Sequence, residues 1–347
     1  EETLNLKEGF GIQLAVNSVF ILNKIGFSNL SKVEIYNPLE LDFYSNKDKI
    51  CNLDLSQFNS ETEKYTTLKR SILIKFLKEK LFTNAIRFNK TVERVKQNQN
   101  TIKIDFKDGE SEEVDYLVVS DGVYSQTKSL IENKVFSPNY FGSLAIRTTV
   151  HTEKILDFNK MNISLLMSSN AHMVLYPVNT AEHNLVFIVR NKVLNFSDER
   201  KLDFIETILE KSILKKNNNL KSLLTGVLNY WPIYTSKDAI NSKFKNVFYL
   251  GDAFYTLPPT MAQGASQSVE GAMELFQSFK DQNSNKKNLY FTNRLNRIKI
   301  TKKRSSLNYF AFHFSNKLLV IFRNLLFKKM IKNKKFIENY LGKVFRK

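Results

Sequence analysis

The strongest chemical signal in this sequence is an aspartate at the end of an apolar run. Residues 247–250 read Val-Phe-Tyr-Leu, and Gly251-Asp252-Ala253 follows at once. The run predicts a buried strand, the glycine lets the backbone turn close to a ligand, and the carboxylate can accept a hydrogen bond from a sugar-like hydroxyl. Because α/β folds bind ligands at the carboxyl ends of their strands, we expect a ligand site at Asp252.

A second group of residues follows the aspartate closely. After Pro258-Pro259 comes Ala262-Gln263-Gly264-Ala265, which opens a predicted helix over residues 265–280. The first backbone amides of a helix have no partner within the helix and favour electron-rich groups. Taken alone, the pattern also suits an ordinary strand–turn–helix unit.

A similar arrangement occurs earlier in the chain. Residues 116–119 form another apolar run, typical of a buried parallel strand, and lead into Asp121-Gly122 and then Ser125. A surface turn is the alternative interpretation of this Asp-Gly pair.

Three weaker candidates lie nearer the N-terminus. Gly9-Phe10-Gly11-Ile12 with Asn17 is a glycine-rich segment, and Arg70 stands within the leucine-rich run 68–73. Val92 precedes Glu93-Arg94-Val95. For Arg70 a solvated surface role is equally compatible with the sequence.

Together, in this order and spacing, these motifs resemble the group A FAD-dependent aromatic monooxygenases. That family has the p-hydroxybenzoate hydroxylase-like fold, and the resemblance is to its salicylate hydroxylase and ubiquinone-biosynthesis hydroxylase branch. It implies that Asp252 contacts the flavin ribitol, that the Gln263-Gly264 segment lies against the isoalloxazine ring, and that Asp121 lies near the pyrophosphate. The implied FAD-binding residues are Arg70, Val92, Asp121, Gly122, Gly251, Asp252, Pro259, Gln263, Gly264 and Ala265.

The sequence departs from the family pattern at three places. Phe254-Tyr255 stands where the family usually has Ala-His, which predicts an altered pocket beside the flavin. Lys128 stands one residue after the usual position of an arginine. No Gly-x-Gly-x-x-Gly occurs near the start, so we expect that the first βαβ unit is largely missing from this sequence.

The predicted fold is α/β, with a Rossmann-like FAD-binding domain, an inserted antiparallel β-sheet substrate domain and a C-terminal helical segment. Helical spacing covers residues 9–26, 66–82, 199–225 and the chain from about 290, and a hairpin is expected over 101–119. Strands are expected at 145–150, 164–167, 173–177 and 185–190. The predicted domains are 1–138 and 241–300 for FAD, 139–240 for the substrate, and 301–347 for the helical segment.

Candidate substrate-pocket residues lie on one predicted strand. Ala171-His172-Met173-Val174-Leu175-Tyr176 resembles a strand over the substrate pocket of salicylate hydroxylase-like members. His172 and Tyr176 are therefore the candidate catalytic residues, and Trp231 is a candidate core or pocket-wall residue. A purely structural role is the alternative for each.

The resemblance implies an enzyme that uses FAD, NADH or NADPH, and O₂ to hydroxylate a small aromatic substrate, with a quinone precursor as one candidate. A base that deprotonates a phenol would assist the reaction. Two alternatives remain: another FAD oxidoreductase on the same fold, such as a halogenase or prenyl reductase, and a flavin-free binding or scaffold protein.

The composition argues against nucleic-acid-binding, disulfide-linked, metal-binding and membrane-spanning classes of protein. The 347 residues carry a net charge of +18 and 42% hydrophobic residues, which allows a sizeable core. No nucleic-acid-binding module accompanies the positive charge, so no nucleic-acid partner is expected. One cysteine, Cys51, permits no internal disulfide, no metal-binding cluster is evident, and no apolar run reaches the roughly 20 residues of a membrane span. These features favour a cytoplasmic protein.

The C-terminal segment 301–347 has an unusual charge balance. It contains thirteen Lys/Arg residues and one acidic residue, Glu338. Leu318, Ile321, Phe322, Leu325 and Leu326 fall at helical spacing within it. The pattern is typical of an amphipathic helix in peripheral contact with the inner face of an anionic membrane. It is equally typical of a helix packed on the catalytic domain with a solvated basic face.

Overall fold

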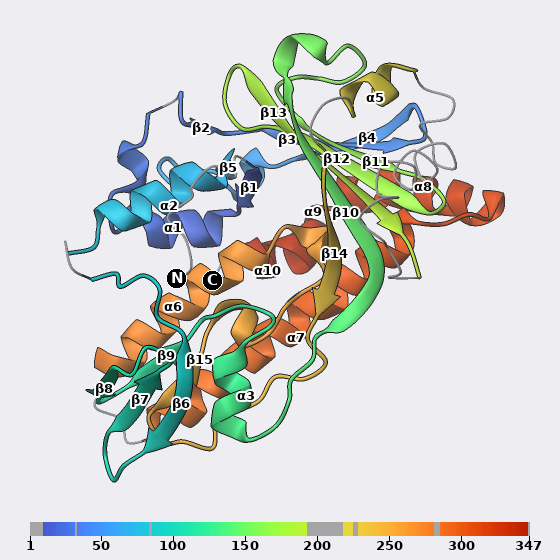
Figure 1. The fold of residues 1–347 in the computed structure, drawn as a ribbon. Coiled ribbons are helices and arrows are strands. Elements are labelled where there is room, and N and C mark those ends of the chain that lie inside the picture. The colour runs from blue at the N-terminus through green and yellow to red at the C-terminus, as the bar shows by residue number, and fades with distance from the viewer. Residues whose placement is uncertain are drawn as a thin grey trace.

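The computed structural model describes residues 10–31, 33–82, 85–192, 218–224, 228–280 and 285–345. A large β-sheet forms one part and two small sheets form another (Figure 1). Two long helices, α6 (Gly264–Lys280) and α7 (Lys286–Phe312), run between these parts. The α/β fold expected from the sequence is confirmed, and so is the helix predicted over 265–280.

The large sheet has seven strands in the order β14-β10-β13-β12-β11-β3-β4. All neighbouring pairs are antiparallel except β3 and β11, which run parallel. The four strands predicted between residues 145 and 190 are confirmed. The seven strands are β3 (Glu40–Ser45), β4 (Asp48–Asp54), β10 (Asn139–His151), β11 (Ile163–Met167), β12 (Ala171–Pro177), β13 (Glu182–Arg190) and β14 (Asn229–Thr235).

Three strands of this sheet were not predicted: β14, and the pair β3 and β4. β3 and β4 come from residues 40–54, which the sequence placed in the first FAD-binding range. Their residues show no clear alternation of polar and apolar side chains. They are recognised as strands only because β3 pairs with the distant strand β11 and β4 pairs with β3. The predicted domain limits stay a prediction, with this strand pair added to the large sheet.

The large sheet buries both of its faces. On one face, residues such as Ile146, Leu175 and Phe187 pack with Leu220 and Leu223 of α5 (Asn218–Leu223). On the other, Val174 and Tyr176 pack with Met261 and with Phe312 of α7. This second face is the one turned toward the motifs identified in the sequence. Of the helix predicted over 199–225, residues 199–217 and 225 lie outside the described part.

The smaller part contains the predicted hairpin and a parallel strand pair. β6 (Val92–Gln97), β7 (Ile102–Phe106) and β8 (Ser111–Val114) form an antiparallel sheet, and Gly109 takes a φ of +87° at the β7–β8 turn. β9 (Leu117–Val119) pairs in parallel with β15 (Val247–Tyr249). Both predicted parallel strands are therefore confirmed, although the side chains of Tyr116 and Val118 are exposed.

The prediction of a helix over residues 9–26 was wrong at its start. Gly11–Leu14 is a strand, β1, paired with β5 (Thr66–Lys69), and the helix α1 covers only Val16–Asn23. The prediction over 66–82 was wrong in the same way, because α2 begins at Arg70 and ends at Glu79. Pairing between strands distant in sequence outweighed the local helical spacing at both places. Gly9 lies outside the described residues.

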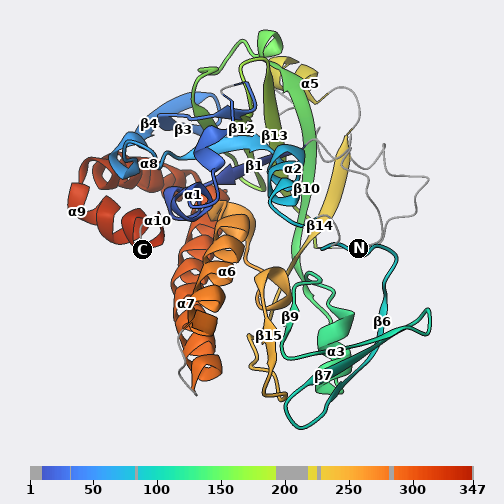
Figure 2. The same cartoon turned by 90° about the vertical axis from the view of Figure 1, so that its left-hand side faces the viewer.

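The C-terminal segment folds back onto the large sheet. α8 (Lys317–Lys332) lies beside β4 (Figure 2), and α9 (Lys334–Ile337) and α10 (Lys343–Phe345) follow it, with α10 near α1. A π-helical turn, Glu338–Gly342, joins α9 and α10. Among the described residues, the model contains no helix with the length and apolar character needed to span a bilayer.

Candidate active site

The two aspartate motifs lie at the ends of neighbouring parallel strands. Tyr249 at the end of β15 is in register with Val119 at the end of β9, and the Leu250 amide donates to the Val119 carbonyl at 2.9 Å. Asp121-Gly122 and Gly251-Asp252 therefore leave the same edge of the sheet. This edge is where α/β folds place their ligands.

Lys128 joins the two motifs directly. It lies on α3 (Gln126–Glu132), whose N-cap Ser125 accepts from the Lys128 amide. The buried Lys128 Nζ donates to the Ala253 carbonyl at 2.8 Å. Burial lowers the pKa of Lys128, and the nearby charge of Asp121 partly opposes this. The lysine that the sequence showed one position late thus fixes the Gly251–Ala253 turn to α3.

Asp252 lies in a short 3₁₀ turn, η6 (Gly251–Ala253), with its side chain open to solvent. Its carboxylate forms no hydrogen bond or ion pair with any other described residue. The surrounding protein nevertheless desolvates it enough to raise its pKa. A carboxylate that is exposed and has no protein partner is suited to accept a hydrogen bond from a bound hydroxyl group.

The turn from Pro259 to Gly264 is fixed by its neighbours. Pro259–Met261 forms a second 3₁₀ turn, η7, and the Thr260 hydroxyl donates to the Ser305 carbonyl of α7 at 2.6 Å. Ala262 then takes a left-handed conformation with φ of +51°. This conformation is uncommon for a residue with a side chain, and it directs the chain into α6.

At the start of α6, Gln263 has a hydrogen-bond donor without a partner, and Gly264 has open space beside its backbone. Gln263 is 2% exposed, and its Oε1 accepts from Gln267, but its Nε2 has no partner among the described residues. No atom lies within 4 Å of a Cβ added at Gly264. The free donor, the open backbone at a helix N-terminus and the Asp252 carboxylate fit the mixed donor and acceptor groups of FAD.

The remaining predicted FAD-binding residues are distributed over both parts of the molecule. Val92 begins β6 and packs in the same apolar cluster as β15. Arg70 begins α2, and its amide donates to the Phe10 carbonyl at 2.7 Å. Ala265 packs against the cluster formed by β1 and α1. The roles of these residues toward FAD stay predictions.

A buried charge network that sequence reasoning missed holds α6 in place. Glu270 of α6 is fully buried, accepts from Asn17 of α1, and pairs with Arg297 of α7 at 2.6 Å and with Arg294 at 3.4 Å. Burial alone would raise the pKa of Glu270, but the Arg297 guanidinium outweighs it and lowers the pKa. Arg297 also donates to the Val344 carbonyl. Only the folded arrangement brings these distant residues together.

The large sheet carries several polar side chains on the face that is turned toward the Pro259–Gly264 turn. Tyr176 on β12 and Asn184 on β13 are paired in register, and both contact Gly11, whose amide donates to Asn184 Oδ1 at 2.8 Å. Arg147 on β10 lies 5.7 Å from the centre of the Trp231 ring. Arg147 Nε and Asn184 Nδ2 are buried and have no partner among the described residues. The sequence did not identify Arg147 or Asn184, because neither belongs to a recognisable motif.

The two candidate catalytic residues face the same side of the sheet. Burial raises the pKa of Tyr176, which keeps its phenol protonated. His172 is 1% exposed, and its Nδ1 lies 2.9 Å from Nε2 of His313. Burial, followed by the His313 charge, lowers the pKa of His172 well below its usual value. Their catalytic roles stay predictions.

Phe254 and Tyr255 are both buried beside α7. The Phe254 ring packs against Tyr290 and Phe291, with centroids 6.4 and 5.9 Å away. Lys302 lies over the Tyr255 ring at 5.2 Å. The departure from the family pattern therefore fills the core between η6 and α7 in this protein.

The fold and site define a class: an α/β protein with a dinucleotide-type loop site facing a mixed β-sheet. A family model described as an FAD binding domain matches residues 14–283, and the chain belongs to this family. As the motifs indicated, it is a group A FAD-dependent aromatic monooxygenase, with FAD as its cofactor.

Similar proteins support this class. The chain is 23% identical over 285 residues to 6-hydroxynicotinate 3-monooxygenase of Bordetella bronchiseptica, covering 78% of this chain and 73% of that protein. It is 23% identical over 286 residues to a 3-amino-4-hydroxybenzoate 2-monooxygenase of Streptomyces platensis, covering 79% and 71%. Among the alternatives left by the sequence, the monooxygenase is thus the one confirmed.

Solved structures share the fold. Klebsiella pneumoniae HpxO, complexed with FAD and uric acid, superposes with a TM-score of 0.78 at 15% identity, covering 96% of this chain and 87% of that one. A salicylate hydroxylase substrate complex gives a TM-score of 0.75 at 16% identity, covering 97% and 89%.

Proposed function

We propose that the protein hydroxylates a hydroxylated aromatic carboxylic acid held between the large sheet and the flavin-binding loops. The observation that carries this proposal is the contact between the two. Met261, two residues before Gln263, packs in one apolar cluster with Tyr176 and Val178 of the sheet. A ligand over the Gln263-Gly264 turn would therefore lie beside the sheet face that carries Arg147 and Tyr176.

The proposed overall reaction is balanced in atoms and electrons. One oxygen atom of O₂ is inserted into an aromatic C–H bond to give C–OH, and the other is released as water. NADH or NADPH supplies two electrons as a hydride, and one further proton comes from solvent. FAD, when bound, supplies the redox chemistry that couples these halves, while the protein binds, orients and excludes water.

The chain's own residues have separable roles in this proposal. The Arg147 guanidinium forms no ion pair with a described carboxylate, so it can pair with the carboxylate of an aromatic acid. The protonated Tyr176 phenol donates a hydrogen bond to the ring substituent. Asn184 Nδ2 supplies a second donor on the same face. The names of two relatives, acting on a hydroxynicotinate and an aminohydroxybenzoate, agree with an acidic aromatic substrate.

Arg147→Met tests this assignment. We expect KM for hydroxybenzoates to rise roughly 10- to 100-fold, as for loss of a charged hydrogen bond, and KM for neutral phenols to change little. The assay is substrate-stimulated NADH or NADPH oxidation by the FAD-saturated protein. The matched control is Arg94→Met, an exposed arginine on β6. An equal loss for acids and neutral phenols would argue against a carboxylate contact.

We propose a quinone precursor as a second, narrower candidate substrate, as in ubiquinone biosynthesis. In that case the protein would be cytoplasmic and would contact the inner face of a membrane through residues 301–347. The observation that favours this candidate is the apolar outer face of α8. The rate of substrate oxidation, measured with and without vesicles, separates the two candidates. Vesicles should accelerate the oxidation of prenylated phenols but not that of hydroxybenzoates.

A further inference from the structure

α8 has an inner face that is firmly attached to the large sheet. The Phe327 ring packs edge-on against Phe43 of β3 at 5.5 Å, and Ile331 joins the same core cluster. Arg323 is 2% exposed, and it donates to Ser45 Oγ at 2.8 Å and to the Ala311 carbonyl at 3.2 Å. The rotation of α8 about its axis is therefore fixed by contacts on this side.

The fixed rotation turns the apolar stripe of α8 outward. A helix packed on the domain through its leucines would bury them, but here the arginine points inward and the leucines point out. Within this stripe the exposed fractions are 77% for Leu318, 47% for Leu319, 56% for Ile321, 62% for Phe322, 62% for Leu325 and 39% for Leu326. A contiguous outward-facing group of this kind marks an interaction surface.

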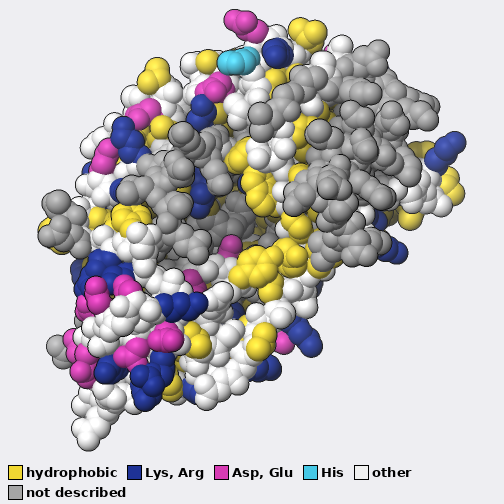
Figure 3. Space-filling view, in the orientation of Figure 1, with side chains coloured by type: hydrophobic (Ala, Val, Ile, Leu, Met, Phe, Trp, Pro, Cys, Tyr) yellow, Lys and Arg dark blue, Asp and Glu magenta, His cyan; other side chains and the backbone are white. Residues whose placement is uncertain are grey.

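The charge around this stripe has a single sign. The sequence has no acidic residue between Asp281 and Glu338. Lys317 precedes the stripe, and five lysines follow it: Lys328, Lys329, Lys332, Lys334 and Lys335. None of these lysines forms an ion pair with another described residue. Hydrophobic and basic side chains project together at the right-hand edge of the molecule, where α8 lies (Figure 3).

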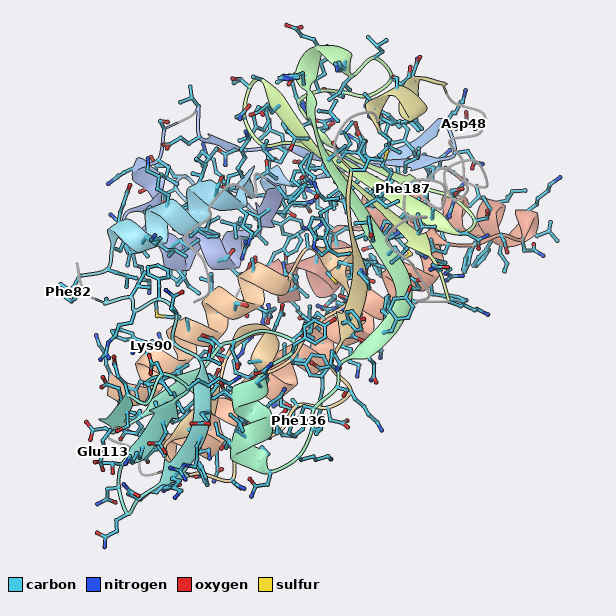
Figure 4. The ribbon with its side chains drawn as sticks, in the orientation of Figure 1. Asp48, Phe82, Lys90, Glu113, Phe136 and Phe187 are labelled. Atoms are coloured by element: carbon cyan, nitrogen blue, oxygen red, sulfur yellow. The ribbon has the colours of Figure 1, made fainter. Side chains whose placement is uncertain are left out.

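The β6–β8 sheet shows the contrast within the same molecule. There Lys90 pairs with Asp108 and Glu110 at 2.6 Å, and Arg94 pairs with Asp105 at 2.7 Å. Lys90 and Glu113 lie on this sheet at the lower left, far from α8 (Figure 4). The unpaired lysines of α8 and α9 are therefore not simply the result of a lysine-rich composition.

We propose that α8 lies in the interface of an anionic lipid bilayer, with its outer stripe inserted and its lysines on the lipid headgroups. Charge complementarity favours this occupant over a second copy of the chain, which would bring two lysine-rich surfaces together. Apolar insertion and electrostatic attraction act together in such helices. The inference rests on the membrane-facing candidate of the proposed function, and it does not depend on the identity of the substrate.

Vesicle flotation tests this proposal. The FAD-saturated protein is mixed with vesicles of phosphatidylcholine alone or with about one third phosphatidylglycerol, whose anionic headgroups attract basic residues. We expect the protein to float with the anionic vesicles, with binding weakened at least tenfold by high salt. Leu318→Gln/Phe322→Gln/Leu325→Gln should weaken it at least tenfold as well.

Matched controls keep the outcome clear. Val135→Gln/Leu156→Gln changes two exposed apolar side chains, 82% and 74% exposed, outside α8, and should float like the wild type. Flavin content and oxidation of a hydroxybenzoate should be unchanged in the α8 variant, so failure to float and failure of the chemistry are separate results. Equal binding to both vesicle types, no binding, or a dimer that the α8 variant abolishes would overturn the proposal.

Discussion

Lys128 and Asp252 have different environments at the η6 turn. Lys128 is buried, and its bond to the Ala253 carbonyl holds the η6 turn against α3. Asp252, one residue earlier on the same turn, has no protein partner among the described residues. One residue thus fixes the turn, while the carboxylate of its neighbour stays unpaired, as its predicted role toward FAD requires.

Asp252→Asn tests the ligand role of this carboxylate. Replacing a charged acceptor with an amide removes about 1.5–3 kcal/mol of a charge-assisted hydrogen bond, so we expect FAD affinity to fall roughly 10- to 100-fold. Titration by flavin fluorescence measures this change. The control Asp48→Asn alters an exposed aspartate on β4, distant from the site (Figure 4). Unchanged affinity in Asp252→Asn would remove the aspartate from the FAD site.

At this scale the sequence predicted that the Asp121 and Asp252 turns follow parallel strands and that a helix begins near Gly264, whereas the roles of these residues toward FAD stay predictions. The Asp121, Asp252 and Gln263-Gly264 motifs are local in sequence, and their short spacing is sufficient to show them. Arg147, Asn184 and Glu270 were missed because each acts through partners more than a hundred residues away, or through unpaired buried atoms that only a folded chain reveals.

At the scale of elements, β1 shows how distant pairing outweighs local spacing. The apolar residues after Gly9 suit a helix, but Gly11 approaches Asn184 and Tyr176 so closely that an added Cβ would lie 2.5 Å from Asn184 Cβ. The strand also pairs with β5 along four residues. Neither contact can be read from the segment itself, whereas the hairpin of β7 and β8, built from neighbouring residues, was predicted correctly.

Gly11→Ala should therefore destabilise the fold. Overpacking of this kind costs typically 1–3 kcal/mol of unfolding free energy, and urea denaturation measures it. Gly264→Ala is the matched control, because a Cβ there meets no atom within 4 Å. We expect Gly264→Ala to leave the unfolding free energy within about 0.5 kcal/mol of the wild type. Equal stability of Gly11→Ala and the wild type would contradict the close contact between β1 and the sheet.

At the scale of the whole molecule, buried polar contacts join segments that lie far apart. Arg297 pairs with Glu270 of α6 and donates to the backbone carbonyl of Val344 in α10. Phe345, also in α10, packs against Phe58 and Tyr65. His172 of the sheet meets His313 at the end of α7. The C-terminal helices are thus part of the same packed structure as the flavin site, although the sequence assigned them a separate range.

The histidine pair gives this packing a pH dependence. Burial lowers the pKa of His313 to about 3 and that of His172 well below 6.5, whereas both would titrate near 6.5 when unfolded. Between about pH 6.5 and 3 the unfolded chain binds more protons, so stability falls as pH decreases through this window. Protonation of each imidazole in the unfolded chain should lower the unfolding free energy by roughly 2 kcal/mol between pH 7 and pH 5.

Comparison with His172→Phe/His313→Phe isolates this effect from that of the carboxylates. Urea denaturation at pH 7, 6 and 5 should show a shallower decline for the double variant, by about 2–4 kcal/mol over the range. Parallel declines for the two proteins would show that these rings are not buried in their neutral forms.

The origin of the oxygen atom in the product tests the central claim most directly. The FAD-saturated protein is supplied with NADH or NADPH, a hydroxybenzoate and ¹⁸O₂, and the product is analysed by mass spectrometry. We predict a hydroxylated product that carries one ¹⁸O atom, with one reduced nicotinamide oxidised for each product formed in a fully coupled reaction. Reduced nicotinamide consumed without any labelled aromatic product, across acidic, phenolic and prenylated substrates, would contradict the assignment as an aromatic monooxygenase.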